Sequence, residues 1–296
     1  MNTISISNNK FNSLTKMELN SKIYNTEGII YNFRYKGSDK VLKRFYSNSG
    51  VTFANKLYTL EMLDYYKNYL PKNFCCPDNL VNVGGEVVGF TMPKIEGINL
   101  RVLLDDEKVT IQEKIYYLYK IGEVLFQMKK IREHTPLKQF YINDLHESNI
   151  IINPDNKDIS ILDLDSCRIF NNGCFASKYL GTNVFVYDKP NKYIYNEDIN
   201  NGYGFIVANE NSDLFCYNIM VLNFLYQGNA HRMNLKQFYE YLNYLNSLNF
   251  NLELLDCFSK IGVFCDNDNP FKWLDTLSEE QVCKARENVY KLNLSK

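Results

Sequence analysis

The clearest pattern along the chain is a pair of short apolar runs separated by turn residues. Residues 150–152 are apolar, the turn-rich residues 154–157 (Pro-Asp-Asn-Lys) follow, and residues 159–162 are apolar again. Two short β-type runs around a turn predict a hairpin. In an antiparallel hairpin the start of the first strand lies beside the end of the second. The residues that flank these two runs are therefore expected at one end of the hairpin.

Three further segments show helical spacing, and one alternates like a strand. Residues 53–70 carry apolar side chains near the helical period. Residues 110–113 (Thr-Ile-Gln-Glu) match a capping box, which opens a helix whose apolar face runs to residue 128. Residues 212–225 begin with a serine suited to an N-cap and are apolar almost all round, as in a buried helix. Residues 41–45 alternate and predict a strand.

Polar side chains with oxygen donors flank the predicted hairpin. Asn149 precedes its first strand, Asp163 follows its second strand, and Asp144 lies on the loop just before. Asn149 and Asp163 are thus expected to meet at one end. Mg²⁺ takes one or two carboxylates and completes its octahedron with phosphate oxygens and water. The pattern therefore predicts an edge suited to Mg²⁺ and a triphosphate.

This spacing resembles the catalytic loop and metal-binding segment of the protein-kinase superfamily. The Asp-to-Asn spacing is kept, and Asp163-Leu164-Asp165 stands where the family has Asp-Phe-Gly, while the His and Arg of the catalytic-loop motif are absent. Within this superfamily, the catalytic-loop and metal-segment patterns most resemble those of divergent bacterial Ser/Thr-kinase-like proteins. The resemblance implies that Asp144 orients the substrate hydroxyl and accepts its proton. It also implies that Asn149 and Asp163 are the magnesium ligands.

The same resemblance implies a fold and its division. It is an α+β, bilobal protein-kinase-like fold, with a small antiparallel-sheet N-lobe that carries one helix and a mostly helical C-lobe. On this alignment the N-lobe spans residues 21–92 and the C-lobe residues 93–296. Residues 1–20 are rich in Ser, Asn and Lys, a composition typical of disordered segments.

Weaker matches supply the remaining parts of a nucleotide site. Gly28 and Ile30 resemble the end of a glycine-rich loop whose two earlier glycines are absent here. Lys43, in the predicted strand, lies at the family's usual distance after Gly28, and Glu61 lies at its distance after Lys43. The family pairs these two residues and so holds the ammonium against the α- and β-phosphates of ATP.

The predicted link between the lobes and a later helix complete the resemblance. Met92 is expected to line the back of the adenine pocket, with the backbone of Pro93 and Ile95 facing the edge of the base. Proline has no N–H, so Pro93 offers only its carbonyl. Asp213, at the start of the predicted buried helix, is expected to brace the catalytic loop through backbone N–H groups. Residues 168–211 are irregular and stand where the family has its activation segment.

Composition narrows the alternatives. The 296 residues are 45% hydrophobic, which is enough apolar content for a full core. The formal net charge of -1 disfavours a dedicated nucleic-acid binder, which would need a basic surface. No apolar run approaches the length that spans a bilayer. The eight cysteines show no C-x-x-C pair and no zinc spacing with the three histidines. We therefore expect a reduced, cytoplasmic location.

Three functional hypotheses stay open at this point. The leading one is an ATP- and Mg²⁺-dependent kinase whose partner is a protein Ser or Thr hydroxyl. The second is a small-molecule kinase of the aminoglycoside or choline type, which His146 in the catalytic loop favours because such enzymes often read Asp-Leu-His there. The third is a pseudokinase, a nucleotide-binding scaffold, which the eroded glycine loop favours. Asn143 replaces the arginine that grips a phosphorylated activation loop, so regulation through that loop is not expected.

Overall fold

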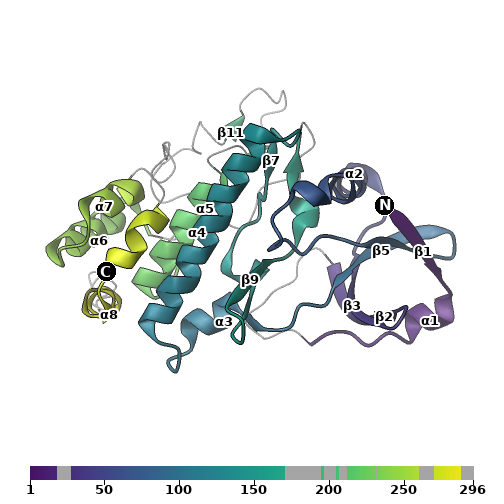
Figure 1. The fold of residues 1–296 in the computed structure, drawn as a ribbon, viewed down its shortest axis with the longest axis horizontal. Coiled ribbons are helices and arrows are strands. Elements are labelled where there is room, and N and C mark those ends of the chain that lie inside the picture. Colours follow the sequence, from purple (N-terminus) through teal and green to yellow (C-terminus); the bar gives the residue numbers. More distant parts are fainter. Residues whose placement is uncertain are drawn as a thin grey trace. The chain divides into compact units, whose positions relative to one another are not determined.

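The fold was analysed in a computed structural model of the whole chain. It describes residues 1–18, 28–170, 195–196, 205–206, 212–230, 233–259 and 270–287. The chain divides into two compact units (Figure 1). The first contains Met1–Val102, Ile131–Phe140 and Ser148–Cys174, and the second contains Leu103–Lys130, Tyr141–Glu147 and Phe175–Lys296.

A five-stranded sheet organises the first unit, in the order β1-β4-β5-β3-β2. Two hairpins supply most of it: β2 (Gly28–Tyr35) with β3 (Ser38–Phe45), and β4 (Asn79–Val83) with β5 (Glu86–Pro93). β3 pairs antiparallel with β5, and β1 (Asn2–Ile6) adds a parallel strand beside β4. The strand predicted over residues 41–45 is confirmed as part of β3. The chain as a whole is a mixed α+β protein with a mainly antiparallel sheet, as the sequence predicted.

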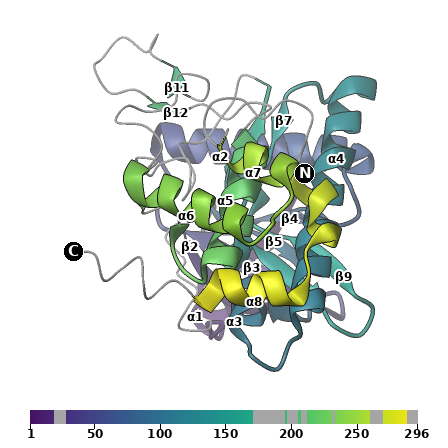
Figure 2. The same ribbon diagram turned by 90° about the vertical axis from the view of Figure 1, so that its left-hand side faces the viewer.

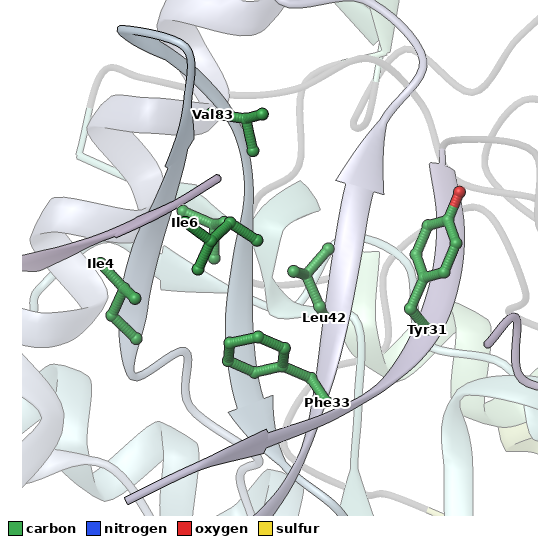
Figure 3. Close-up of a cluster of buried hydrophobic side chains, with 7 residues drawn as sticks. Ile4, Ile6, Tyr31, Phe33, Leu42 and Val83 are labelled. Carbon is green, nitrogen blue, oxygen red and sulfur yellow. The ribbon is translucent and has the colours of Figure 1, made fainter. Parts of the chain in front are cut away.

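The first residues of the chain form a strand and a short helix, in a segment whose composition is typical of disorder. In β1 the side chains of Ile4 and Ile6 are buried, and they pack with Phe33 and Leu42 in one apolar cluster (Figure 3). The short helix α1 (Asn8–Asn12) follows. Two isoleucines at a spacing of two suffice to place one face of a strand against a core. The alternation of apolar residues therefore outweighs the polar average of the segment.

The opposite face of the sheet carries a long helix. α2 (Gly50–Tyr66), which the short helix η1 (Lys67–Tyr69) extends, confirms the helix predicted in this region. Leu60 of α2 belongs to an apolar cluster with Val41 and Phe45 of β3. Side chains alternate along a strand, so Leu42 faces the β1 side and its odd-numbered neighbours face α2. Lys43 therefore points into the layer between the sheet and α2.

The predicted hairpin at residues 150–162 is confirmed. β8 (Ile150–Asn153) pairs antiparallel with β9 (Asp158–Ile161), and β6 (Ile98–Asn99) adds a third strand. Ile161 ties the hairpin to the loop before β4, because its N–H donates to the Asn73 carbonyl at 2.7 Å and its carbonyl accepts from the Cys75 N–H at 2.9 Å. These bonds group the hairpin with the first unit, whereas the sequence placed it beyond a boundary at residue 92.

The second unit is mostly helical (Figure 2). Its helices are α3 (Leu100–Asp105, which begins in the first unit), α4 (Ile111–His134, whose last turn belongs to the first unit), α5 (Ser212–Tyr226), α6 (Leu235–Ser247), α7 (Leu252–Ser259), η5 (Pro270–Thr276) and α8 (Glu279–Glu287). The buried Tyr217 of α5 donates its hydroxyl hydrogen to the Leu118 carbonyl of α4 at 2.8 Å. Within the described ranges, no helix has both the length and the apolar character needed to cross a membrane.

Both helices predicted in this unit are confirmed. The capping box that opens α4 is present, since the Glu113 N–H donates to the Thr110 hydroxyl at 3.2 Å and the Glu113 carboxylate accepts from the Thr110 N–H at 3.4 Å. α5 is buried along almost its whole length. The remaining short elements are β7 (Phe140–Tyr141), η2 (Glu147–Asn149), η3 (Leu164–Ser166), β10 (Arg168–Ile169), β11 (Tyr195–Asn196) and β12 (Phe205–Ile206). Most of the irregular segment 168–211 lies outside the described residues.

Candidate functional site

A buried lysine of β3 forms the centre of the candidate site in the first unit. Only 1% of the Lys43 side chain is exposed. Its ammonium Nζ contacts Oδ1 of Asp163 and lies 2.8 Å from Oδ1 of Asp165. A buried ammonium group costs several kcal/mol unless it is paired and hydrogen-bonded. The two aspartates meet that requirement, and both belong to the segment that the sequence assigned to metal binding.

A second lysine reaches the same carboxylates from α2. Lys56 is 7% exposed and lies on the inner face of the helix with Leu60 and Leu63, at spacings of four and three residues. Its Nζ is 2.8 Å from Oδ2 of Asp165. The fully buried Asp165 therefore bridges two lysines, one from the sheet and one from the helix. This cluster of two lysines and two aspartates, Lys43, Lys56, Asp163 and Asp165, is called the charged cluster below.

The predicted pair of Lys43 with Glu61 does not appear in the structure. Glu61 is exposed on α2 and takes part in no ion pair among the described residues. Glu61 follows Leu60 by one position, so its side chain is rotated by about 100° from the inner face of the helix. α2 thus presents a cation, Lys56, to Lys43 and the aspartates, where the family presents a carboxylate.

The hairpin and the turn after it position the aspartates. Ile150 and Ile161 are register partners, and the Leu162 N–H donates to the Asn149 carbonyl at 2.8 Å, so Asn149 lies beside the end of β9 as predicted. Asp163 then adopts a left-handed conformation (φ 61°, ψ 40°) and opens η3. Such a backbone conformation is uncommon outside glycine, although aspartate is one of the residues that tolerates it. The tight turn brings Asp165 back toward the two lysines.

The two aspartates differ in exposure and in proton affinity. Loss of hydration, with a smaller contribution from the Asp165 charge, raises the pKa of Asp163 to about 7, although the Lys43 ammonium opposes this shift. Burial also favours the neutral form of Asp165, but the Lys43 and Lys56 ammonium groups outweigh it and lower the pKa of Asp165. About 23% of the Asp163 side chain is exposed and none of the Asp165 side chain is. Asp163 is therefore the carboxylate that can reach a ligand, and Asp165 is an internal counter-ion.

The donors at this edge fit Mg²⁺ that arrives with a nucleotide. Within the described residues, no group of three or more His, Cys, Asp or Glu side chains could hold a metal ion by itself. One partly exposed carboxylate, Asp163, and the half-buried amide of Asn149 are a small protein donor set. Mg²⁺ commonly binds to one or two carboxylates together with substrate phosphates and water. Asn149 and Asp163 would hold such an ion in that way.

The residues expected around the nucleotide base gather in one apolar cluster. Met92 and Val41 are register partners in β5 and β3, and Ile30, Ile95 and Leu162 pack against the cluster to which they belong. Ile30 is in turn the register partner of Lys43. The three packing residues are only partly buried, so the edge of this cluster is accessible. It offers an apolar surface next to the lysine.

Two further predicted nucleotide contacts have structural roles in the sheet. Gly28 is the first residue of β2, and a Cβ there would overlap the Arg44 carbonyl oxygen of β3. This close strand pairing requires glycine at residue 28, whether or not phosphates lie nearby. Pro93 is exposed at the end of β5, and its carbonyl oxygen lies 3.6 Å from the Cys75 Sγ.

The predicted catalytic loop lies in the second unit, where Asp213 shapes it as predicted. The Asp213 carboxylate accepts from the backbone N–H of Ile142 at 2.9 Å and of Asn143 at 3.0 Å. Asn143 has a positive φ of 66°, so the backbone turns sharply just before Asp144. His146 Nε2 lies 3.6 Å from Oδ2 of Asp144, and 18% of the Asp144 side chain is exposed. The helix start thus fixes the loop that carries the proposed catalytic carboxylate.

The structure therefore brings together part of the predicted set. Lys43, Asp163 and the start of the hairpin at Asn149 belong to one unit, and Asp144 belongs to the other with its brace, Asp213. Sequence reasoning missed Lys56, although a lysine four residues before Leu60 on an apolar helix face was a visible signal.

A scan against protein-family models finds no match to this chain, and a search of curated proteins finds no significant relative.

Proposed function

We propose that the protein is an ATP- and Mg²⁺-dependent phosphotransferase of the bilobal protein-kinase-like class, which acts on a Ser or Thr hydroxyl of a protein. The observation that supports this proposal is the contact of Lys43 with Asp163. The two residues are 120 positions apart in the sequence, yet a buried strand lysine contacts the partly exposed carboxylate that follows the hairpin. Phosphoryl transfer depends on such positioned charges more than on covalent chemistry of the protein.

Each residue then has a separate task. Lys43 donates hydrogen bonds to the phosphates of the nucleotide, while Asn149 and Asp163 hold Mg²⁺, which neutralises charge on the phosphoryl oxygens when it is bound. Ile30, Met92 and Ile95 contact the base. Asp144 orients the acceptor hydroxyl and takes its proton.

Lys56 completes the charge balance of this proposal. With ionised groups, the charged cluster contains two positive and two negative charges. Without Lys56 it would carry a net charge of −1, which would oppose the approach of a triphosphate. Because Asp165 is neutralised by Lys56 and also holds Lys43 at 2.8 Å, Lys43 stays in place when a phosphate replaces its contact with Asp163.

Two observations support alternative functions. His146 lies 3.6 Å from Asp144, and a histidine at this loop position favours a small-molecule hydroxyl as acceptor. Lys43 is almost completely enclosed, which favours a scaffold that binds nucleotide without turnover. Both alternatives share the nucleotide site with the leading proposal and differ in the fate of the γ-phosphate.

The test is incubation of the purified full-length chain with γ-labelled ATP and Mg²⁺. Label on the chain itself or on a generic protein acceptor supports a protein kinase, and label only on a metabolite supports a small-molecule kinase. Nucleotide-dependent thermal stabilisation without transfer supports the scaffold. We expect Asp144→Asn to lower transfer by about a hundredfold or more while the fold is retained.

A matched pair of lysines on β3 provides the control for Lys43. Lys40 is also ion-paired, with Nζ 2.6 Å from the Asp78 carboxylate, but it lies outside the charged cluster. Lys43→Met should abolish transfer and weaken nucleotide binding, whereas Lys40→Met should change neither by more than about twofold. Equal effects of the two substitutions would contradict the assignment of Lys43.

A further inference from the structure

A second feature, in the second unit, is a cleft of about 640 Å³ between the start of α4 and α8. Val109, Thr110 and Ile111 line one side, and Cys283 and Arg286 of α8 line another. Lys114 and Gln227 also line the cleft. A volume of this size accommodates a metabolite of moderate size. All of these residues belong to one unit, and none of them has a role in the proposed phosphotransfer.

Among the described residues, two cations in the cleft wall, Lys114 and Arg286, have no carboxylate within ion-pair distance. Lys114 is only 3% exposed, and it takes part in no ion pair or hydrogen bond of its side chain among the described residues. The Nη1 atom of Arg286 is buried and has no hydrogen-bond partner there. The Arg286 guanidinium instead lies 5.0 Å from the centre of the Phe224 ring of α5, a cation–π contact. Buried side-chain nitrogens in folded proteins are normally hydrogen-bonded, so the Nη1 atom of Arg286 is exceptional among the described residues.

The two positive charges also act on each other. Burial is the main cause that lowers the pKa of Lys114, and the positive charge of Arg286 is the second. Burial also lowers the pKa of Arg286. Three carboxylates line the cleft, Glu107, Glu279 and Glu287, and two more, Asp105 and Asp106, lie near enough to act on Lys114, Asp105 also on Arg286. All of them are exposed, so water screens their charges from the two cations. Glu279 already accepts a hydrogen bond from the Gln112 amide at 2.9 Å. The first turn of α4 adds the positive end of a long helix dipole at the same wall.

We propose that this cleft binds a small phosphomonoester, whose phosphoryl group takes the place of the missing counter-ion between Lys114 and Arg286. A phosphate monoester carries a charge of about −1.5 to −2 at neutral pH, which matches two unpaired cations better than one carboxylate does. The guanidinium donates in a fixed fork that suits phosphate oxygens, and the ammonium adds a point charge. Val109 and Ile111 offer an apolar surface to the body of the ligand, and Thr110 and Gln227 offer polar contacts.

Calorimetric titration of the full-length chain with phenyl phosphate and with inorganic phosphate tests the proposal, with chloride at equal ionic strength as the reference. We expect saturable binding of both probes and tighter binding of phenyl phosphate, because its ring reaches the apolar wall. Lys114→Met and Arg286→Met should each weaken binding by about tenfold or more, as expected for the loss of a charged hydrogen-bond partner. Lys108→Met should leave the affinity for both probes unchanged. Lys108 lines the same cleft but is exposed, so water screens its charge.

One further variant distinguishes probe binding in the cleft from probe binding at the proposed nucleotide site. Lys43→Met should retain the binding of phenyl phosphate, so the result does not depend on the proposed kinase activity. Wild-type affinity in both Lys114→Met and Arg286→Met would overturn the proposal, and so would the absence of binding to the folded wild-type chain at millimolar probe. Loss of binding in Lys43→Met with retention in Lys114→Met would place the phosphate in the charged cluster and equally refute the second site.

Discussion

Each unit of this protein contains a pair of cations that are buried or partly buried, and the two pairs differ in what surrounds them. In the charged cluster of the first unit, Lys43 and Lys56 share the buried carboxylate of Asp165, and Asp163 supplies a second negative charge. In the cleft of the second unit, Lys114 and Arg286 have no carboxylate partner among the described residues. A paired cluster holds its side chains in place before a ligand arrives, whereas an unpaired one depends on the ligand for its counter-charge. The first suits positioning of a reactive group, and the second suits recognition of an anion.

The largest effect is expected from the removal of the shared counter-ion. Asp165→Asn removes the carboxylate charge that the buried ammonium groups of Lys43 and Lys56 share. Breaking a buried ion pair from one side typically costs about 3–5 kcal/mol. Chemical denaturation of the wild-type chain and the variant measures this difference in the free energy of unfolding.

Asp78 provides the matched control for that substitution. It is also ion-paired to a lysine of β3, but 32% of its side chain is exposed. Asp78→Asn should therefore cost no more than about 1 kcal/mol. If the two variants lost the same stability, the charged cluster would have no special role in the first unit.

A smaller difference in stability is expected between substitutions of the two α2 residues that could interact with the charged cluster, Lys56 and Glu61. Lys56→Met removes one of the two ammonium groups from Asp165 and should cost about 1–3 kcal/mol. Glu61→Gln changes an exposed side chain and should stay within about 0.5 kcal/mol. Denaturant midpoints with equal slopes check both values. A larger cost for Glu61→Gln than for Lys56→Met would restore the partner that the sequence predicted.

This reversal on α2 shows where the sequence was informative and where it was not. The hairpin, the capped helix α4 and the buried α5 follow from local periodicity, and the bond from Asp213 to the loop before Asp144 follows from a matched motif. The choice between Glu61 and Lys56 depends on which face of α2 meets the sheet. The packing of Leu60 and Leu63 fixes that face. The distance in sequence from Lys43 to Glu61, on which the predicted pair was based, gives no information about it.

The N-terminal strand and the cleft illustrate two other limits. Average composition concealed the alternation of Ile4 and Ile6, so a strand was mistaken for a disordered segment. The cleft joins Lys114 to Arg286, which are far apart in the sequence, and neither residue belongs to a motif. Unpaired burial of a charge is a property of the tertiary structure, and it cannot be read from residue types.

The pH dependence of stability distinguishes the two aspartates of the charged cluster. The pKa of Asp163 is raised from 3.8 to about 7, so the folded chain holds this proton more tightly than the unfolded chain does. The associated stability is fully present below about pH 4 and is lost as the pH rises through about 7. Asp165 has a lowered pKa, so its contribution is present above about pH 4 and is lost at lower pH.

Asp163→Asn tests that assignment directly. The variant should lose the decline in unfolding free energy between about pH 4 and pH 7 and should keep the acid-side decline that belongs to Asp165. Denaturation series at several pH values, at constant ionic strength, give both slopes. An unchanged decline up to pH 7 in the variant would show that another group titrates there.

The smallest effect, and the one with the opposite sign, is expected at Lys114. Lys114 is a buried residue whose ammonium is partly desolvated, as the lowered pKa indicates. Its replacement by an apolar side chain of similar length removes a desolvation penalty and breaks no ion pair of the described residues. Lys114→Met should therefore leave the free energy of unfolding unchanged or raise it by up to about 1 kcal/mol in phosphate-free buffer. Addition of phenyl phosphate should then stabilise the wild-type chain and not the variant, because only a state that binds ligand gains stability from it. The same substitution at Lys56 lowers stability in either buffer, so the two lysines, both buried within helices, should respond in opposite directions. A loss of stability at Lys114 as large as that at Lys56 would mean that it has an internal partner, and the contrast between a closed and an open cationic pair would then fail.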